Sequence, residues 1–153
     1  MLEHDSRIAV AVSGGKDSMV LLHVLYKIES RFPSELIVIH LDEGIKGYSE
    51  KNSRIVQEIS KKLGLPLLTA SYRELFGFNI DDISSLQREK RIYAICTYCG
   101  VWRRWGLNYL ALKANADRLA TAHCLDDEAQ TILMNILRAV SYTHLTLPTT
   151  ERV

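Results

Sequence analysis

The chain has 153 residues, of which 47% are hydrophobic, and its formal net charge is +1 at pH 7. This length and apolar content predict a single domain with one sizeable core, and the near-neutral charge does not mark a strong binder of polyanions. No apolar run is long enough for a membrane span and the first residues lack the regions of a signal peptide, so we expect a cytoplasmic protein without membrane contact.

The first predicted elements are a buried strand over residues 7–12 and a helix over residues 16–29. In the helix, the 3.6-residue period predicts one apolar stripe of Val20, Leu21, Val24 and Ile28. The two elements are joined by Val12-Ser13-Gly14-Gly15-Lys16-Asp17-Ser18.

This joining segment predicts a phosphate-binding loop. Two adjacent glycines let the backbone turn sharply and bring its N–H groups to a ligand, and two serine hydroxyls add donors. The positive end of the following helix favours an anion, and Lys16 adds a mobile charge. The Asp17 carboxylate would repel a phosphate unless a divalent cation bridges them, so we interpret Asp17 as a magnesium ligand. The alternative is an ordinary glycine-rich turn; the spacing fits neither a Walker loop nor a dinucleotide-binding turn.

A second strand over residues 36–39 delivers polar residues at its carboxyl end, among them His40 and Asp42. Such an edge binds ligands in open α/β sheets, although both side chains can equally be ordinary strand-end residues. A helix over residues 49–63, with Gly64 as its C-cap, and a third strand over residues 67–71 follow. This alternation predicts a doubly wound parallel sheet covered by helices on both faces.

Residues 75–78 break the pattern, and a polar helix is predicted from residue 81 to about residue 95. The segment 81–118 holds seven basic side chains against four acidic ones, whereas residues 1–80 are balanced. Any nucleic-acid surface is therefore expected in this segment. Its basic residues are Arg88, Lys90, Arg91, Arg103, Arg104, Lys113 and Arg118.

Cys96 and Cys99 form a C-x-x-C motif that is followed by Gly100. Two thiolates at this spacing can ligate one metal, with the glycine allowing the backbone to fold around it. The alternatives are half of a zinc site, a redox dithiol of the thioredoxin type, or two incidental cysteines. The redox motif would be expected right after the first strand, where the phosphate loop already lies.

A helix over residues 101–115 carries Trp102 and Trp105 near its start, and we expect both tryptophans in the core. A fourth strand over residues 118–122 ends in an acidic cluster, residues 123–128, which opens a helix over residues 129–137. Acids at the positive end of a helix are often only caps. Their place at the carboxyl end of a strand favours a part in the active site.

The loop at residues 13–18 resembles the PP-loop of the ATP pyrophosphatases. Together with residues 42–48, 96–104 and 121–138, it resembles the tRNA 2-thiolation enzymes of the wobble-uridine and archaeal or thermophile thiouridine synthetase type. The resemblance implies an enzyme that binds ATP, carries a [4Fe-4S] cluster on three cysteines, and adenylates the C2 oxygen of a tRNA uridine before sulfur replaces it. A ubiquitin-like carrier or another donor would supply the sulfur, and a homodimer is possible.

The resemblance also implies roles for individual residues. Asp127 would be the acid–base or magnesium residue, and Arg103 would stabilise developing charge or orient the sulfur. Cys96 and Cys99 would be cluster ligands. ATP would be bound by Ser13, Gly14, Gly15, Lys16, Asp17, Ser18, His40, Asp42 and His123.

The chain also departs from that pattern. Ala122-His123-Cys124 stands where Gly-His-Asn is usual, so one amide is lost. We expect a PP-loop domain over residues 1–138 and an atypical, foreign or disordered tail over residues 139–153. A cysteine-rich zinc module and a second half with the third cluster cysteine are missing, which predicts a fragment. The open alternatives are another ATP pyrophosphatase, of the lysidine or amidotransferase synthetase type, and a non-catalytic nucleotide-binding module.

Overall fold

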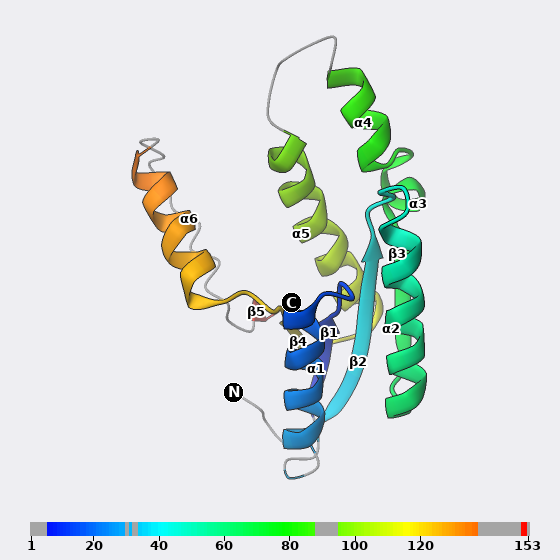
Figure 1. Cartoon of the computed structure of the whole chain (residues 1–153). Coiled ribbons are helices and arrows are strands. Elements are labelled where there is room, and N and C mark those ends of the chain that lie inside the picture. Colours follow the sequence, from blue (N-terminus) through cyan, green and yellow to red (C-terminus); the bar gives the residue numbers. More distant parts are fainter. Residues whose placement is uncertain (1–5, 30, 32–33, 88–94, 138–150, 153) are drawn as a thin grey trace.

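A computed structural model describes residues 6–29, 31, 34–87, 95–137 and 151–152 (Figure 1). Within them, five strands form one sheet in the order β3-β2-β1-β4-β5. The pairs β1–β2, β1–β4 and β2–β3 are parallel, and only β5 runs antiparallel, against β4. The strands are β1 (Arg7–Ala11), β2 (Glu35–Asp42), β3 (Leu67–Ser71), β4 (Arg118–Ala120) and β5 (Glu151–Arg152).

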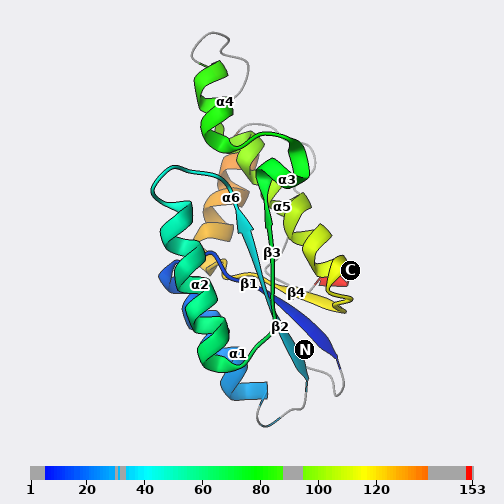
Figure 2. The same ribbon diagram turned by 90° about the vertical axis from the view of Figure 1, so that its right-hand side faces the viewer.

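Helices cover both faces of the sheet (Figure 2). On one face lie α1 and α2, and on the other lie α3 and α5, while α4 and α6 extend beyond the carboxyl ends of the strands (Figure 1). The described helices are α1 (Lys16–Glu29), α2 (Ser49–Leu63), α3 (Tyr72–Phe76), α4 (Ile80–Gln87), α5 (Ile95–Lys113) and α6 (Leu125–Leu137).

The strand β1 shows why both faces must be covered. Its alternate residues Ile8 and Val10 belong to the core cluster under α1 and α2, whereas Ala9 between them belongs to the cluster under α5. Successive side chains of a strand point to opposite faces, so a strand that is apolar at every position needs packing on both sides. The predicted doubly wound parallel sheet is confirmed, with one short antiparallel strand added at its edge.

The helix α2 ends as predicted. Gly64 adopts φ 67°, and its N–H donates to the Lys61 carbonyl oxygen at 3.2 Å. By contrast, α3 was not predicted. Ser71 and Glu74 form a capping box, in which each side chain accepts from the other residue's backbone N–H. This local capping begins a one-turn helix where the apolar pattern is too short to show one.

The predicted apolar stripe of α1 is confirmed at Leu21, which packs against the core, and is wrong at two other positions. Val20 and Val24 are 62% and 46% exposed, whereas Ser18 and Leu22 are buried. The helix is rotated because the Ser18 hydroxyl is needed beneath the loop, where it bonds Ser13 and Gly15. Ser18 and Leu22 lie four residues apart and therefore share one face.

Several predicted boundaries also shift. The helix expected from residue 101 begins at Ile95, so the C-x-x-C motif forms its first turns instead of a preceding loop. The fourth strand ends at Ala120 rather than residue 122, and α6 begins at Leu125 rather than residue 129. The end of the predicted polar helix lies outside the described residues, as does nearly all of the predicted tail. No helix in the described ranges has the length and apolarity that crossing a membrane requires.

Candidate active site

The chain order places a crevice between β1 and β4. The chain winds from β1 through β2 to β3 in one direction, and β4 then pairs with the other side of β1. In open α/β sheets, ligands bind outside the carboxyl ends of the strands at such a reversal. A cavity of about 350 Å³ lies there.

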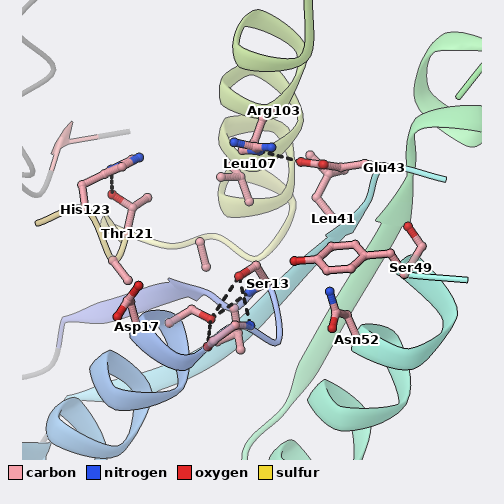
Figure 3. A pocket seen from close by; sticks show the side chains of 16 residues that line it. Ser13, Asp17, Leu41, Glu43, Ser49, Asn52, Arg103, Leu107, Thr121 and His123 are labelled. Carbon is pink, nitrogen blue, oxygen red and sulfur yellow. Dashed lines mark hydrogen bonds and ion pairs between the residues drawn. The ribbon is translucent and has the colours of Figure 1, made fainter. Parts of the chain in front are cut away.

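Five parts of the chain line this cavity, one of them the end of β2 with the residue after it (Figure 3). The loop after β1 forms its floor with Ser13 and Asp17. Asn52 of α2 lies on one side, and His123, which follows β4, lies on the other. Arg103 of α5 lies above the loop.

Ser18 holds the loop together from below. Its hydroxyl donates to the Gly15 carbonyl oxygen at 2.9 Å and accepts from the Ser13 N–H at 3.2 Å. The Gly15 N–H in turn lies 3.3 Å from the Ser13 hydroxyl oxygen. Gly15 O also accepts the first helical bond of α1, from Met19. The loop is therefore built onto the N-terminus of α1, where the helix dipole favours an anion.

Gly14 is required by packing as well as by the turn. Its φ is 86°, and a Cβ there would come within 3.0 Å of the Asn52 Cβ atom. Any larger residue would push the loop away from α2, and its left-handed backbone would be strained as well. Asn52 itself lines the cavity, although no motif in the sequence pointed to it.

His40 and Asp42, which we predicted to contact the nucleotide, are not among the residues that line the cavity. His40 is buried, with Nδ1 2.7 Å from the Val12 carbonyl oxygen and Nε2 3.0 Å from the Ser53 hydroxyl. Asp42 accepts from the Gly44 N–H at 2.8 Å. In this structure both side chains support the loops around the cavity from outside.

Arg103 connects the cavity with a cysteine sulfur. Its Nε donates to Glu43 Oε1 at 2.5 Å, and its Nη2 lies 3.2 Å from Cys99 Sγ. Arg103 and Glu43 both line the cavity. The hydroxyl of the buried Tyr72 donates to the Cys99 carbonyl oxygen at 3.1 Å and fixes the helix turn that carries the thiol. A guanidinium in this position presents its fixed positive charge to both the sulfur and the cavity.

The charges around Cys99 act in opposite directions. Burial and the Glu43 carboxylate raise the pKa of the Cys99 thiol above its ordinary value, while Arg103 lowers it. Burial also raises the pKa of the Tyr72 hydroxyl, which stays protonated and can donate. The hydrogen bond to Glu43 raises the pKa of Arg103, so the guanidinium keeps its charge.

Asp127 lies in the first turn of α6. Its Oδ2 accepts from the Cys124 N–H at 3.2 Å and from the Cys124 thiol at 2.9 Å. These two bonds lower the pKa of the Asp127 carboxyl. Asp127 is exposed and is not one of the cavity-lining residues. His123 does line the cavity, and its Nδ1 lies 3.0 Å from the Thr121 hydroxyl.

Not every predicted site residue is brought to the cavity wall. Gly14 and Lys16 belong to the loop without lining the cavity. The wall also contains Glu43, Tyr48 and Thr121, which lie in segments that carry the family resemblance but to which the sequence analysis assigns no individual role. No local pattern signals the pairing of Glu43 with Arg103, because the two residues lie 60 positions apart in the sequence. Six of the nine predicted nucleotide contacts belong to one continuous segment that forms a single structural unit.

The donor set fits a magnesium ion better than a complete cluster. Asp17 brings a carboxylate to the cavity beside the loop, which suits a cation that bridges to phosphate oxygens. Cys99 is a free thiol, and the side chain of Cys96 lies outside the described part of the chain. Among the side chains that are described, no three His, Cys, Asp or Glu residues group as a metal site. The thiol of Cys124, the remaining cysteine, donates a hydrogen bond to Asp127.

A parallel sheet with a glycine loop at its reversal point defines a nucleotide-binding α/β domain. The sequence matches the family described as PP-loop domain over residues 2–149, and the chain belongs to this family. The predicted superfamily is thereby confirmed.

Related proteins narrow the comparison. The chain is 41% identical over 140 residues to cytoplasmic tRNA 2-thiolation protein 1 of Chlamydomonas reinhardtii, a match that covers 90% of this chain and 38% of the relative. The protein of the same name from Caenorhabditis elegans is also 41% identical, with 37% of its length covered. The chain thus spans less than two fifths of the length of these curated relatives.

Two solved structures share the fold. The U34-tRNA thiolase NcsA from Methanococcus maripaludis with its [4Fe-4S] cluster superposes with a TM-score of 0.78 at 32% identity, covering 90% of this chain and 44% of that one. An NH3-dependent NAD synthetase from Campylobacter jejuni superposes with a TM-score of 0.53 at 11% identity, covering 77% and 47%. The latter likeness shows the fold alone.

Proposed function

We propose that this chain is the ATP-binding part of a cytoplasmic enzyme that thiolates a tRNA uridine. The relatives named as tRNA 2-thiolation proteins and the thiolase NcsA support this proposal. The single observation that carries it is the position of Arg103, which contacts both the Cys99 sulfur and Glu43 at the cavity wall. A domain that only binds nucleotide has no need of a cysteine held beside the nucleotide cavity.

The loop residues would bind ATP through their N–H and hydroxyl groups, and Asp17 would hold Mg²⁺. The C2 oxygen of the uridine would attack the α-phosphate, so that pyrophosphate leaves and the uridine is adenylated. Sulfur would then replace the oxygen, and AMP would leave. Arg103 would stabilise the negative charge that develops at the reacting phosphate, with Glu43 fixing its position.

We further infer that Cys96 and Cys99 hold part of an iron–sulfur cluster. When bound, such a cluster supplies an iron that can carry the sulfur to be transferred. Its third protein ligand would come from outside this chain. Cys124 is the one further cysteine of the sequence, and its thiol is engaged in a hydrogen bond to Asp127. A ubiquitin-like carrier or another donor would deliver the sulfur, and a homodimer remains part of the proposal.

The proposal is tested by measuring pyrophosphate release from ATP in the presence of tRNA. We expect release with a tRNA that carries an unmodified wobble uridine, and none when that uridine is replaced by cytidine. Glu43→Gln should slow release about tenfold or more while ATP still binds, because Arg103 loses its charged anchor. Glu58→Gln, at an exposed site on α2 that does not line the cavity, is the matched control.

Two results would contradict this function. ATP binding without pyrophosphate release in the presence of any tRNA would indicate a non-catalytic module. Release that depends on lysine or ammonia instead of sulfur would indicate another class of ATP pyrophosphatase.

A further inference from the structure

The face of α5 that points away from the sheet is apolar and exposed. Val101, Trp105 and Leu112 lie four and then seven residues apart, which places them on one side of the helix. They are 60%, 51% and 59% exposed. The sequence predicted Trp105 in the core, and this prediction is wrong, since the residues that pack on the sheet are Leu110, Ala111 and their neighbours.

Two aromatic side chains on this face form an ordered pair. The rings of Trp105 and Tyr109 are stacked, with centroids 5.5 Å apart and planes 6° from parallel. Phe76 of α3 lies against Trp105 from the side, with ring centroids 5.3 Å apart. The tryptophan is therefore held in place by its neighbours although half of its surface is exposed. A platform that is already ordered loses little side-chain entropy when a flat ligand stacks on it.

The charge of this helix is of one sign. Between Ile95 and Lys113 the sequence contains three basic residues and no acidic residue. Arg103 is directed to the cavity, which leaves Arg104 and Lys113 on the exposed surface. On the neighbouring helix α4, the Asp82 carboxylate is paired with Arg73 at 3.1 Å. The aromatic pair thus shares its helix with exposed cations and with no acidic residue.

We propose that this outer face of α5 binds single-stranded RNA by stacking unpaired bases on Trp105 and Tyr109. Every base presents a π-face, and stacking on aromatic side chains next to basic residues is the usual way in which proteins hold single strands. Arg104 and Lys113 attract the phosphates on either side. This inference rests on the proposed function, in which tRNA is the substrate, and it names a contact region for that substrate.

The location suits a nucleotide a few positions away from the reacting one. Arg103 and Leu107 of the same helix line the nucleotide cavity. The outer face lies across the helix from them, a distance of about 10 Å, the diameter of a helix with its side chains. Because the strand must pass around the helix to reach both places, an RNA loop that delivers one uridine into the cavity can place a base a few nucleotides away from that uridine on the outer face of α5.

The test measures binding of a fluorescent RNA hairpin with a uridine-containing loop, beside a blunt RNA duplex of the same stem. We expect Trp105→Ala and Tyr109→Ala each to weaken hairpin binding about tenfold and to leave duplex binding unchanged. Trp105→Phe should retain most of the affinity, since it keeps an aromatic face. Arg104→Gln and Lys113→Gln should each weaken the binding of both RNAs. Each should also reduce the dependence of that affinity on salt by about one released counterion.

Leu112→Ser is the matched control, because it changes the same face without removing a ring. Affinity for ATP should stay at the wild-type value in all these variants, which confirms that they fold. Wild-type protein that does not prefer the hairpin, or aromatic variants that keep hairpin affinity, would overturn the proposal. If Leu112→Ser and Trp105→Ala instead reduce self-association in sedimentation while RNA binding is unchanged, the face is a protein interface. Failure of the proposed function would look different: hairpin binding would persist without pyrophosphate release.

Discussion

Asp17 is the acidic side chain that the glycine loop carries into the nucleotide cavity (Figure 3). We predict that Asp17→Asn weakens magnesium-dependent ATP binding by at most about 3 kcal/mol, the range for one charge-assisted contact. Folding should change little, because the Asp17 side chain is exposed. Calorimetric titration with ATP, with and without Mg²⁺, separates the magnesium-dependent part of the affinity from the rest, and Glu58→Gln provides the control. Equal affinity in mutant and wild type would leave Asp17 with a purely structural part in the first turn of α1.

Asp127 makes the start of α6 sensitive to acid. Two bonds from Cys124 hold its pKa below the ordinary value of 3.8. Because the folded-state pKa is lower than the unfolded one, the bonds stabilise the helix start above pH 4, and this contribution is lost as the pH falls through the folded-state pKa.

We therefore predict that Cys124→Ala raises the pKa of Asp127 toward its ordinary value, since the thiol bond is lost while the backbone N–H remains. Carboxyl-carbon NMR titration of Asp127 measures the shift directly. A titration curve identical to that of the wild type would show that the thiol does not bond the carboxylate in solution.

At the scale of elements, the sequence predicts what depends on local chemistry. The loop after β1, the end of α2 at Gly64 and the alternation of strands and helices follow from glycine positions and apolar periodicity. The rotation of α1 could not be predicted, because Val20 and Val24 match an apolar stripe as well as Leu22 does. Only the fold shows that Ser18 must face inward. The Glu43–Arg103 pair likewise depends on two elements that meet only after folding.

The close approach of α5 to the sheet gives a prediction about two glycines in the same helix. A Cβ on Gly106 would come within 2.7 Å of Leu41 Cδ2, whereas one on Gly100 would meet nothing within 4 Å. Alanine at an exposed helical glycine stabilises by roughly 0.5–1 kcal/mol, whereas overpacking a core costs about 1–3 kcal/mol.

We expect Gly100→Ala to raise the free energy of unfolding above that of the wild type. The free energy of unfolding of Gly106→Ala should be at least about 1 kcal/mol lower than that of Gly100→Ala. Urea denaturation of both variants measures the difference. Leu41 also lines the cavity, so Gly106→Ala alone should alter ATP affinity. Equal stabilisation by both alanines would mean that Leu41 moves aside without cost.

For the whole molecule, the prediction concerns iron. Since this chain offers Cys96 and Cys99 but no third grouped ligand in its described part, it should hold a [4Fe-4S] cluster poorly or only with an external thiol. A protein extended to the length of its relatives should hold one firmly. Anaerobic reconstitution of both lengths, with iron and sulfide quantified, tests this, and Cys96→Ala is the variant expected to lose the metal.

Two outcomes would contradict the ligand assignment. The first is a short chain that binds four irons stably and loses them on Cys124→Ser. The second is that both lengths bind zinc and neither binds iron, which would require sulfur chemistry without this cluster.

Cys99, Arg103 and Leu107 follow one another at intervals of four residues along α5. A helix rises 1.5 Å and turns about 100° per residue, so each interval advances about 6 Å along the axis and turns the side chain by only about 40°. The helix thereby sets the distance between the sulfur and the wall of the nucleotide cavity. One extra residue between Cys99 and Arg103 would turn the thiol by about a further 100° and carry it away from the guanidinium, while the loop, the sheet and the nucleotide cavity stayed as they are.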